Sequence, residues 1–537
     1  MELKQASVSL QREGRVGLVV IDKPPLNLID AEIREGLAAA LATVLSDASL
    51  DAVLLCSAGA HFMAGVDISE FDGARGGPSL QDIQATIESA PKPIVAAIQG
   101  MALGGGLELA MACHYRVADC AAKLGLPEIT LGVIPGAGGT QRLPRLVGAR
   151  KALAIILAGA PLSAAQAKAC GLIDAEALVD VRAEALTYCR ALIGTAAAIR
   201  RTCDLVADRA GFDAEGIKQE LQAHARALKG RTTQMLVVSA VTAAVEGSFS
   251  AGLKIEAQLA HRSLESLESR ALRHLFFAER SARKVKSDAA VADKRSYVPA
   301  AVVANAGFGF IGNRMMLDGY CREAEQLLLE GASPAQLDAA LESFGFAMGP
   351  QKVSDLGGTD VGTKAREELY RTEYRPEPYF VIADRLTALG RLGQKTGSGF
   401  YGYPKGSRAG VPDPEVSRII ESLAAKLHIV RRDVSDLEIV ERCLLSLINV
   451  GAAVLDEGVA QLSADVDVVW TSGYGFPRHF GGPMFYADSL GLPHVADRIR
   501  HYHYLLGHYW KPAALIERLA DAKSSFRQWD RERATRQ

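Results

Sequence analysis

The stretch that decides the fold and the expected chemistry is Ile98–Arg142, IQGMALGGGLELAMACHYRVADCAAKLGLPEITLGVIPGAGGTQR. Three consecutive glycines, Gly104–Gly106, follow a predicted strand and open LELAMAC, which is typical of a helix start. Backbone N–H groups at a helix N-terminus are free, and glycines let an anion or a developing oxyanion approach the main chain closely. The pattern therefore predicts an anion-stabilising site at the start of this helix.

Two glutamates and a second turn lie close to this stretch in the sequence. Upstream, HFMAGVDISEF at 61–71 predicts a tight turn in which the N–H of Val66 supplies a second donor. Glu108 falls in the first turn of the predicted helix and Glu128 in the turn LPEI, and paired carboxyls amid apolar residues suit general acid and base catalysis. The alternative is a helix-dipole charge at Glu108 and an ordinary loop carboxylate at Glu128. Spacing alone leaves both interpretations open.

The flanking sequence predicts a layered α/β domain that is followed by helices. Apolar runs at 15–22, 51–57 and 93–100 indicate buried strands, and 31–45 indicates a helix between the first two. Beyond about residue 180, the composition favours helices over 181–205, 212–245 and 256–285.

Length and composition narrow the class of protein. The 537 residues exceed the roughly 250–300 that one hydrophobic core supports, so several domains are expected. With 49% hydrophobic residues, 23% charged residues and a net charge of -2, the chain is typical of a globular enzyme and not of a nucleic-acid-binding protein. It has no run of 18 apolar residues, so no membrane span is expected.

The location expected from the sequence is the cytoplasm. Eight scattered cysteines without a CxxC pair favour a reducing compartment. The first residues lack a signal peptide's apolar block, and the final RERATRQ is not a peroxisomal address.

An internal repeat lies in the second half of the chain. The segment 330–358 recurs at 457–491, with four matched features offset by 129 to 133 residues. These are Asp338 and Asp467, the Gly-Phe pairs at 345 and 475, the Gly-Pro pairs at 349 and 482, and Asp355 and Asp488. Two copies at this spacing predict duplicated helical domains.

Three ordered motifs in the first half resemble the crotonase (enoyl-CoA hydratase/isomerase) superfamily. They are AGVDISEF at 64–71, GGGLELAMACHYRVA at 104–118 and LPEITLGVIPGAGGTQRLPRLVG at 126–148. The resemblance implies an α/β crotonase domain of the spiral ββα type. It implies oxyanion-hole amides at Val66 and Gly105, catalytic carboxyls at Glu108 and Glu128, and further substrate-binding positions at Ala64, Gly65, Asp67, Gly104 and Gly136. The sequence departs from the family pattern at Ser69 and His114.

The resemblance also implies a mechanism. Two N–H donors stabilise the enolate that forms when water adds to a trans-2-enoyl-CoA thioester. Glu108 orients and deprotonates the water that attacks C3, and Glu128 delivers a proton to C2, which gives (3S)-3-hydroxyacyl-CoA. If Glu128 alone moves a proton between C2 and C4, the same site isomerises Δ3 to Δ2 double bonds.

The second half resembles the two all-α C-terminal domains of 3-hydroxyacyl-CoA dehydrogenase in multifunctional β-oxidation enzymes. The motifs lie at 309–341, 344–362 and 393–404. In that family an NAD-binding Rossmann domain precedes them, and only a short connector stands in its place here. Gly307, Gly309 and Gly312 have G-x-G-x-x-G spacing, but no second strand follows, so a domain-entry turn is expected instead of a dinucleotide site. Asn313 matches a dehydrogenase active-site residue whose partners belong to the missing domain.

The predicted organisation therefore has five parts. They are a crotonase core at 1–190, a helical extension and linker helix at 191–285, a connector at 286–305, and helical dehydrogenase-type domains at 306–405 and 406–537. We expect an acyl-CoA substrate, no cofactor, no metal and no dehydrogenase activity, in a monomer or small oligomer with a thiolase as a candidate partner. The alternative is a non-catalytic scaffold that binds acyl-CoA or a thiolase, and the intact pair of glutamates argues against it.

Overall fold

The structure is a computed structural model that describes residues 4–5, 7–72, 76–195, 199–284, 311–369 and 380–534. It divides into two compact units, Met1–Arg270 and Ala271–Gln537, which are described one after the other. The five-part division expected from the sequence is finer than this and stays a prediction. Its connector, 286–305, lies outside the described residues.

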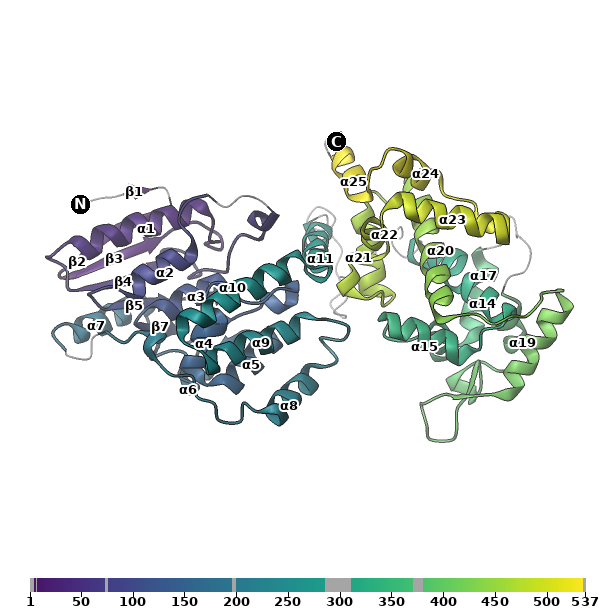
Figure 1. The fold of residues 1–537 in the computed structure, drawn as a ribbon, viewed down its shortest axis with the longest axis horizontal. Coiled ribbons are helices and arrows are strands. Elements are labelled where there is room, and N and C mark those ends of the chain that lie inside the picture. Colours follow the sequence, from purple (N-terminus) through teal and green to yellow (C-terminus); the bar gives the residue numbers. More distant parts are fainter. Residues whose placement is uncertain are drawn as a thin grey trace. The chain divides into compact units, whose positions relative to one another are not determined.

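A seven-stranded sheet in the order β1-β2-β3-β4-β5-β7-β10 organises the first unit (Figure 1). The pairs β1–β2 and β2–β3 are antiparallel, and all later pairs are parallel. The strands are β1 (Lys4–Gln5), β2 (Val8–Glu13), β3 (Val16–Ile21), β4 (Ala52–Ser57), β5 (Ile94–Ile98), β7 (Tyr115–Asp119) and β10 (Ala175–Ala177). The expected α/β layer architecture is confirmed.

Both faces of the central strands are buried, which explains why they read as continuous apolar runs. Val19 and Leu55 point into the larger core, with α1 (Ala31–Ser46) and α2 (Leu80–Glu88). Leu18 and Leu54, one residue earlier, point to the opposite face, which α7 (Val181–Leu192) covers. Because successive side chains alternate across a strand, each run serves two cores.

A second, three-stranded sheet turns the chain back over the first. The predicted strand at 93–100 ends as β5 at Ile98, because Gly100 adopts a φ of +59° and redirects the chain. The new sheet has the order β6-β8-β9, formed by Met101–Leu103, Lys123–Gly125 and Leu162–Ser163.

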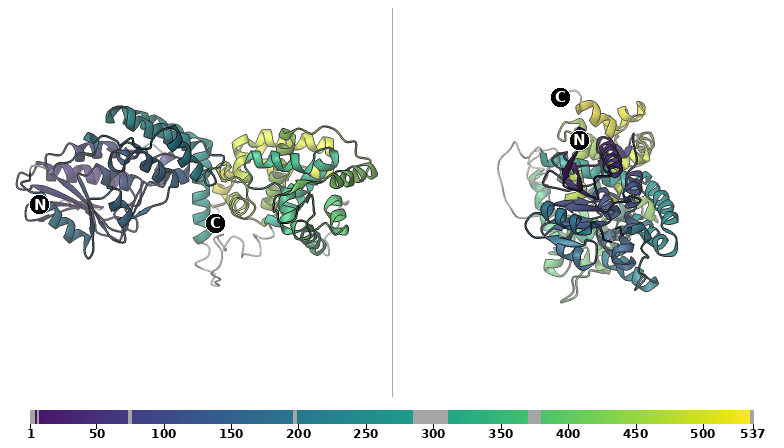
Figure 2. Two further views of the ribbon diagram at one scale, coloured as in Figure 1. Left: turned by 90° about the horizontal axis from the view of Figure 1, so that it is seen from below. Right: turned by 90° about the vertical axis from the view of Figure 1, so that its left-hand side faces the viewer.

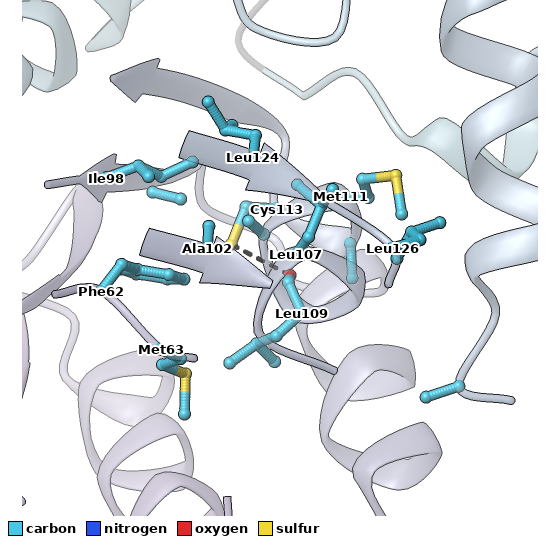
Figure 3. Packing of buried hydrophobic residues seen from close by; sticks show 14 of the residues in the cluster. Phe62, Met63, Ile98, Ala102, Leu107, Leu109, Met111, Cys113, Leu124 and Leu126 are labelled. Carbon is cyan, nitrogen blue, oxygen red and sulfur yellow. Dashed lines mark hydrogen bonds between the residues drawn. The ribbon is translucent and has the colours of Figure 1, made fainter. Parts of the chain in front are cut away.

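Helix α3 (Gly105–Ala112) follows β6 and is entirely buried. Leu107 and Leu109 pack with Phe62 and Ala102, as Figure 3 shows. Cys113 caps the C-terminus of the helix, and its Sγ donates to the Leu109 carbonyl oxygen at 3.7 Å. The start of α3 is therefore fixed in a rigid apolar core.

The helices after the core differ in their bounds from the runs that the sequence predicted. Among the described residues of the run 181–205, the α-helix is α7, which ends at Leu192 because Gly194 follows with a φ of +78°. A short 3-10 helix, η3 (Thr202–Asp204), lies near the end of the run. The run 212–245 forms two helices, α8 (Ala214–His224) and α9 (Thr233–Glu246). The third run begins earlier than predicted, as α10 (Phe249–Glu265), because the Ser248 side chain caps its N-terminus; α11 (Leu267–Lys284) follows. The remaining helices of this unit are α4 (Gly139–Val147), α5 (Ala149–Ala158) and α6 (Ala164–Ala169).

The second unit consists almost entirely of helices (Figures 1 and 2). After the π-helical turn η4 (Met315–Cys321), they run from α14 to α25 around one apolar core. They are α14 (Arg322–Glu330), α15 (Pro334–Phe344), α16 (Pro350–Gly357), α17 (Thr359–Leu369), α18 (Val381–Ala388), α19 (Pro414–Lys426), α20 (Asp436–Asp456), α21 (Ser463–Gly473), α22 (Pro483–Leu490), α23 (Leu492–Leu506), α24 (Ala514–Asp521) and α25 (Phe526–Ala534). The only strands described in this unit are β11 (Tyr401–Gly402) and β12 (Val411–Pro412).

The repeated aspartates make equivalent contacts in both copies. Asp338 on α15 accepts hydrogen bonds from the N–H groups that begin α16, and Asp467 on α21 accepts them from those that begin α22. Asp355 on α16 accepts from the N–H groups of 400 and 401, and Asp488 on α22 accepts from those of 526 and 527. The repeat thus preserves buried carboxylates that satisfy free backbone donors.

The glycines with G-x-G-x-x-G spacing, for which a domain-entry turn is expected, are only partly described. Gly307 and Gly309 lie outside the described residues, whereas Gly312 and Asn313 lie in helical backbone that leads into η4. The Tyr474 hydroxyl donates to Asn313 Oδ1 at 3.1 Å. In the described part of the chain, no helix is long and apolar enough to cross a membrane.

Candidate active site

The start of α3 lies beside the turn that the sequence predicted upstream. Short parallel bridges join Met63 to Ala102 and Val66 to Ile29, so the backbone at 63–66 runs along the entry to α3. A Cβ on Gly105 would lie 2.6 Å from Val66 Cγ2, so the close approach of these two segments requires glycine at 105. The two predicted oxyanion-hole positions are therefore neighbours.

The N–H groups at these two positions are available to a ligand. Ile29 donates its N–H to the Gly65 carbonyl and accepts from the Asp67 N–H, so Val66, between them, points its own N–H away from Ile29. Gly105 is the first residue of α3 and has no carbonyl one turn earlier within the helix. Among the described residues, neither N–H has a hydrogen-bond acceptor.

Glu108 is buried against the N-terminus of another helix. Its side chain is 2% exposed, and its Oε1 accepts the N–H groups of Ala137 and Gly139, each at 2.8 Å. Burial raises the pKa of Glu108, and the two N–H groups together with the Arg142 guanidinium oppose that increase. The turn that leads into α4 thus supplies partners for the charged form of this carboxyl.

Glu128 has a different environment. It begins the short 3-10 helix η2 (Glu128–Leu131), and a Cβ on Gly104 would lie 2.9 Å from its Oε1. Its Oε2 is buried and accepts no hydrogen bond from any described residue. Burial raises the pKa of Glu128 well above the ordinary value, and the neighbouring Glu108 carboxylate raises it further. This carboxyl therefore favours its protonated form.

The remaining predicted substrate-binding residues lie around this pair. Ala64 and Gly65 form the turn beside α3, with the Ala64 N–H bound to the Leu26 carbonyl at 3.0 Å. Gly136 precedes the 137–140 turn, and its carbonyl accepts a hydrogen bond from Gln81 Nε2 at 2.8 Å. The Asp67 Oδ1 accepts hydrogen bonds from the N–H and the hydroxyl of Ser69, so its carboxylate caps a turn. The structure thus brings Val66, Gly104, Gly105, Glu108 and Glu128 together at one place.

The substituted position His114 is part of the core. Its ring is buried, and its Nδ1 accepts the Ile94 N–H at 2.9 Å. Burial lowers the pKa of His114 to about 4, so this ring stays neutral at physiological pH. The departure from the family pattern at 114 therefore serves packing.

A third buried carboxyl, which the sequence did not reveal, lies at the same turn. Glu256 on α10 accepts the Gly138 N–H at 2.5 Å and the Thr140 N–H at 2.9 Å. Burial and, to a smaller degree, the Glu108 carboxylate raise the pKa of Glu256 to about 8. The available sequence signal was the spacing of small residues around it, Gly252 and Ala260, four positions before and four after.

Comparison with known families agrees with this geometry. Residues 11–235 match the model of the enoyl-CoA hydratase/isomerase family, and residues 309–403 and 439–531 match that of the 3-hydroxyacyl-CoA dehydrogenase C-terminal domain. The first match contains both predicted catalytic glutamates and both predicted oxyanion-hole positions. The second covers both copies of the internal repeat.

Curated relatives contain the same two parts over nearly their full length. The peroxisomal bifunctional enzyme of Danio rerio is 30% identical, over 94% of this chain and 96% of the relative. Its human counterpart is 31% identical, over 91% and 93%. The peroxisomal fatty acid beta-oxidation multifunctional protein MFP2 of Arabidopsis thaliana is 26% identical, over 93% and 95%.

These alignments also agree with a missing internal domain. The alignment to the Danio rerio enzyme is 691 residues long although this chain has 537, so at least 154 aligned positions have no counterpart here. That is the size of one ordinary domain. The chain therefore belongs to the enoyl-CoA hydratase/isomerase family, and over 94% of its length to the multifunctional β-oxidation enzymes that join this domain to the C-terminal domain of 3-hydroxyacyl-CoA dehydrogenase.

Proposed function

We propose that Glu108 is the base and Glu128 the acid of a site that hydrates trans-2-enoyl-CoA to (3S)-3-hydroxyacyl-CoA. The contrast between the two carboxyls supports this assignment. Glu108 accepts two N–H groups, which favour its charged form, whereas Glu128 keeps an unpaired buried oxygen and a strongly raised pKa. A base needs the ionised form and an acid needs the protonated form.

In the proposed mechanism, the thioester oxygen lies between the N–H groups of Val66 and Gly105. Attack on C3 moves negative charge onto this oxygen, and preorganised donors stabilise the charge where it develops. Glu108 takes a proton from the attacking water, and Glu128 gives a proton to C2. The proton that the water loses on bonding to C3 therefore goes to Glu108, and the proton of the new C2–H bond comes from Glu128.

We further propose that the site isomerises Δ3-enoyl-CoA through Glu128 alone. The reaction removes a proton from C2 and returns one to C4, so it needs no activated water. A carboxyl with a raised pKa is a stronger base when ionised, so it takes the C2 proton readily and then holds it for transfer to C4. Glu108 is then dispensable for isomerisation but required for hydration.

The remaining parts of the proposal concern what acts with this chain. Hydration and isomerisation need no cofactor besides the CoA thioester substrate, and we propose that this chain does not carry out the dehydrogenase step. A thiolase partner and a monomeric or small oligomeric state rest on the resemblance to multifunctional β-oxidation enzymes. Eight free cysteines support a reducing compartment; the cytoplasm is our proposal, and two of the cited relatives are named as peroxisomal bifunctional enzymes.

The test is a pair of isosteric variants. Glu108→Gln and Glu128→Gln should each lower the kcat for crotonyl-CoA hydration by about two decades or more, because each removes a proton-transfer group. Isomerisation of a 3-enoyl-CoA should fall much less in Glu108→Gln than in Glu128→Gln. The control is Glu265→Gln, an exposed carboxyl of the same unit.

Hydration is followed by the loss of absorbance of the conjugated enoyl thioester. Isomerisation is followed by the disappearance of the 3-enoyl-CoA, separated by chromatography. If both variants hydrate within threefold of the parent, the assignment of the two glutamates is wrong. If the parent itself does not hydrate crotonyl-CoA, the protein is a non-catalytic acyl-CoA-binding scaffold and the proposal is wrong. If Glu108→Gln impairs isomerisation more than Glu128→Gln, the two roles are reversed.

A further inference from the structure

One face of α10 packs against the turn at residues 137–140, which donates hydrogen bonds to Glu108. Its positions 252, 256, 260 and 263 recur at helical spacing and so share this face. A Cβ on Gly252 would lie 2.0 Å from Gln141 Oε1, and a Cβ on Gly136 would lie 3.0 Å from Ala260 Cβ. Figure 1 shows α10 running beside α4, against which it packs. The approach is so close that no water layer separates helix and turn.

Glu256 is the acidic residue on this face. It is 1% exposed, and its two oxygens accept the N–H groups of Gly138 and Thr140 and the Thr140 hydroxyl. Glu108 accepts the N–H groups of Ala137 and Gly139. Four successive N–H groups, at residues 137 to 140, therefore alternate between two carboxyls from different helices.

This alternation makes the two carboxyls depend on each other. A backbone turn offers its N–H groups in fixed relative directions, so holding those of Gly138 and Thr140 also fixes those of Ala137 and Gly139. Without Glu256, two buried donors would lose their acceptors, and buried donors are nearly always satisfied in native structures. The turn would rotate to recover acceptors and would carry the partners of Glu108 with it.

We propose that Glu256 is a positioning residue for hydration, which keeps the 137–140 turn aimed at Glu108 and makes α10 part of the active site. Glu256 lies beyond residues 11–235, which match the hydratase/isomerase family. The inference rests on the proposed role of Glu108 as the base. The other titratable groups near this turn are Glu128 and Arg142. The Arg142 guanidinium forms a bidentate salt bridge with Glu88.

The test compares two reactions, because a residue that acts through Glu108 should affect only one of them. Glu256→Ala removes both acceptors and should lower the kcat for hydration at least tenfold, with KM within threefold and isomerisation within threefold of the parent. Glu256→Gln keeps one acceptor and adds a donor for the Thr140 hydroxyl, so its hydration should lie between those of Glu256→Ala and the parent. Glu265→Gln makes the same chemical change on the exposed side of the same helix and should change neither reaction.

Glu108→Gln measured in parallel separates this inference from the proposed function. If Glu108→Gln loses hydration selectively and Glu256→Ala does not, the inference is wrong and the proposed function stands. If Glu108→Gln shows no selectivity, the assigned role of Glu108 is wrong. Equal losses of both reactions in Glu256→Ala, together with a lower melting temperature, would indicate a structural role only and overturn the inference. If Glu256→Ala does not fold, parental hydration by Glu256→Gln overturns it, and a selective loss supports it.

Discussion

Gly104→Ala should damage catalysis as well as stability, because the added methyl group meets the proposed acid. Gly104 has a φ of +51° and a ψ of -128°, a conformation that costs an alanine about 1–3 kcal/mol. The new Cβ would lie 2.9 Å from Glu128 Oε1. That is roughly half an ångström closer than non-bonded heavy atoms prefer. Since this carboxyl is the end of a flexible side chain, it will move away and relieve the contact.

The displacement sets the expected loss of activity. A misplacement of about 1 Å at a reacting group can cost on the order of a hundredfold, so half of that predicts about tenfold. Hydration and isomerisation should both fall, because both use Glu128. The control is Gly14→Ala, where φ is +66° and no heavy atom lies within 4 Å of the new Cβ.

Both variants should therefore melt earlier than the parent, and only Gly104→Ala should lose kcat. Steady-state rates with crotonyl-CoA and a 3-enoyl-CoA are compared at a temperature where both variants are folded. A kcat for Gly104→Ala within twofold of that for Gly14→Ala would refute the placement of Glu128 at the reacting atoms.

Two other predictions concern the second unit. Glu325 is buried, accepts the N–H groups of Ile382 and Ala383, and has a pKa that burial raises from 4.5 to about 8. Its contribution to stability is present below about pH 4.5 and is lost as the pH rises towards 8, since the unfolded chain releases this proton first. Glu325→Gln should thus flatten the decline in unfolding free energy between pH 5 and 8. Urea titrations followed by tryptophan fluorescence report on this unit, because all three tryptophans lie in it; a slope equal to that of the exposed control Glu421→Gln would contradict the reasoning. Secondly, the protein should not reduce NAD with (3S)-hydroxybutyryl-CoA, because hydride transfer requires a site that holds the nucleotide against the substrate. A 340 nm signal that disappears in Asn313→Ala would show that the second unit had been misinterpreted.

The sequence best predicted those elements whose apolar pattern favours one kind of secondary structure. The strands at 16–21 and 52–57 were found within one residue of their predicted bounds, because short apolar runs between polar residues fit a buried strand better than a helix of ten or more residues. The helical run at 181–205 was longer than the observed α7, since Ala-rich composition alone does not reveal that Gly194 turns the chain. Local propensity set the type of element, and single glycines set its end.

At the candidate site, motif spacing predicted the residues and not their environments. Glu108 and Glu128 both follow glycines and apolar residues in the sequence, yet one carboxyl accepts two N–H groups and the other has an unpaired oxygen. Glu256 was not predicted at all, because it belongs to a helix rich in charged residues, where a glutamate is usually exposed. Its burial depends on contacts with Gly138 and Thr140, which lie 118 and 116 positions earlier in the sequence. The small residues Gly252 and Ala260, four positions either side, are a local sign of close packing but do not identify the partner.

The separation of acid and base follows from the number of donors that one turn can offer. Residues 137 to 140 present four N–H groups, and Glu108 and Glu256 use all of them. Glu128 therefore receives none and, in a buried position beside another carboxylate, holds its proton more strongly. A carboxyl that accepts N–H groups is stabilised in its charged form, which suits the proposed base. In this view α10 contributes to catalysis without touching the substrate, because its Glu256 accepts two of the four N–H groups at residues 137 to 140.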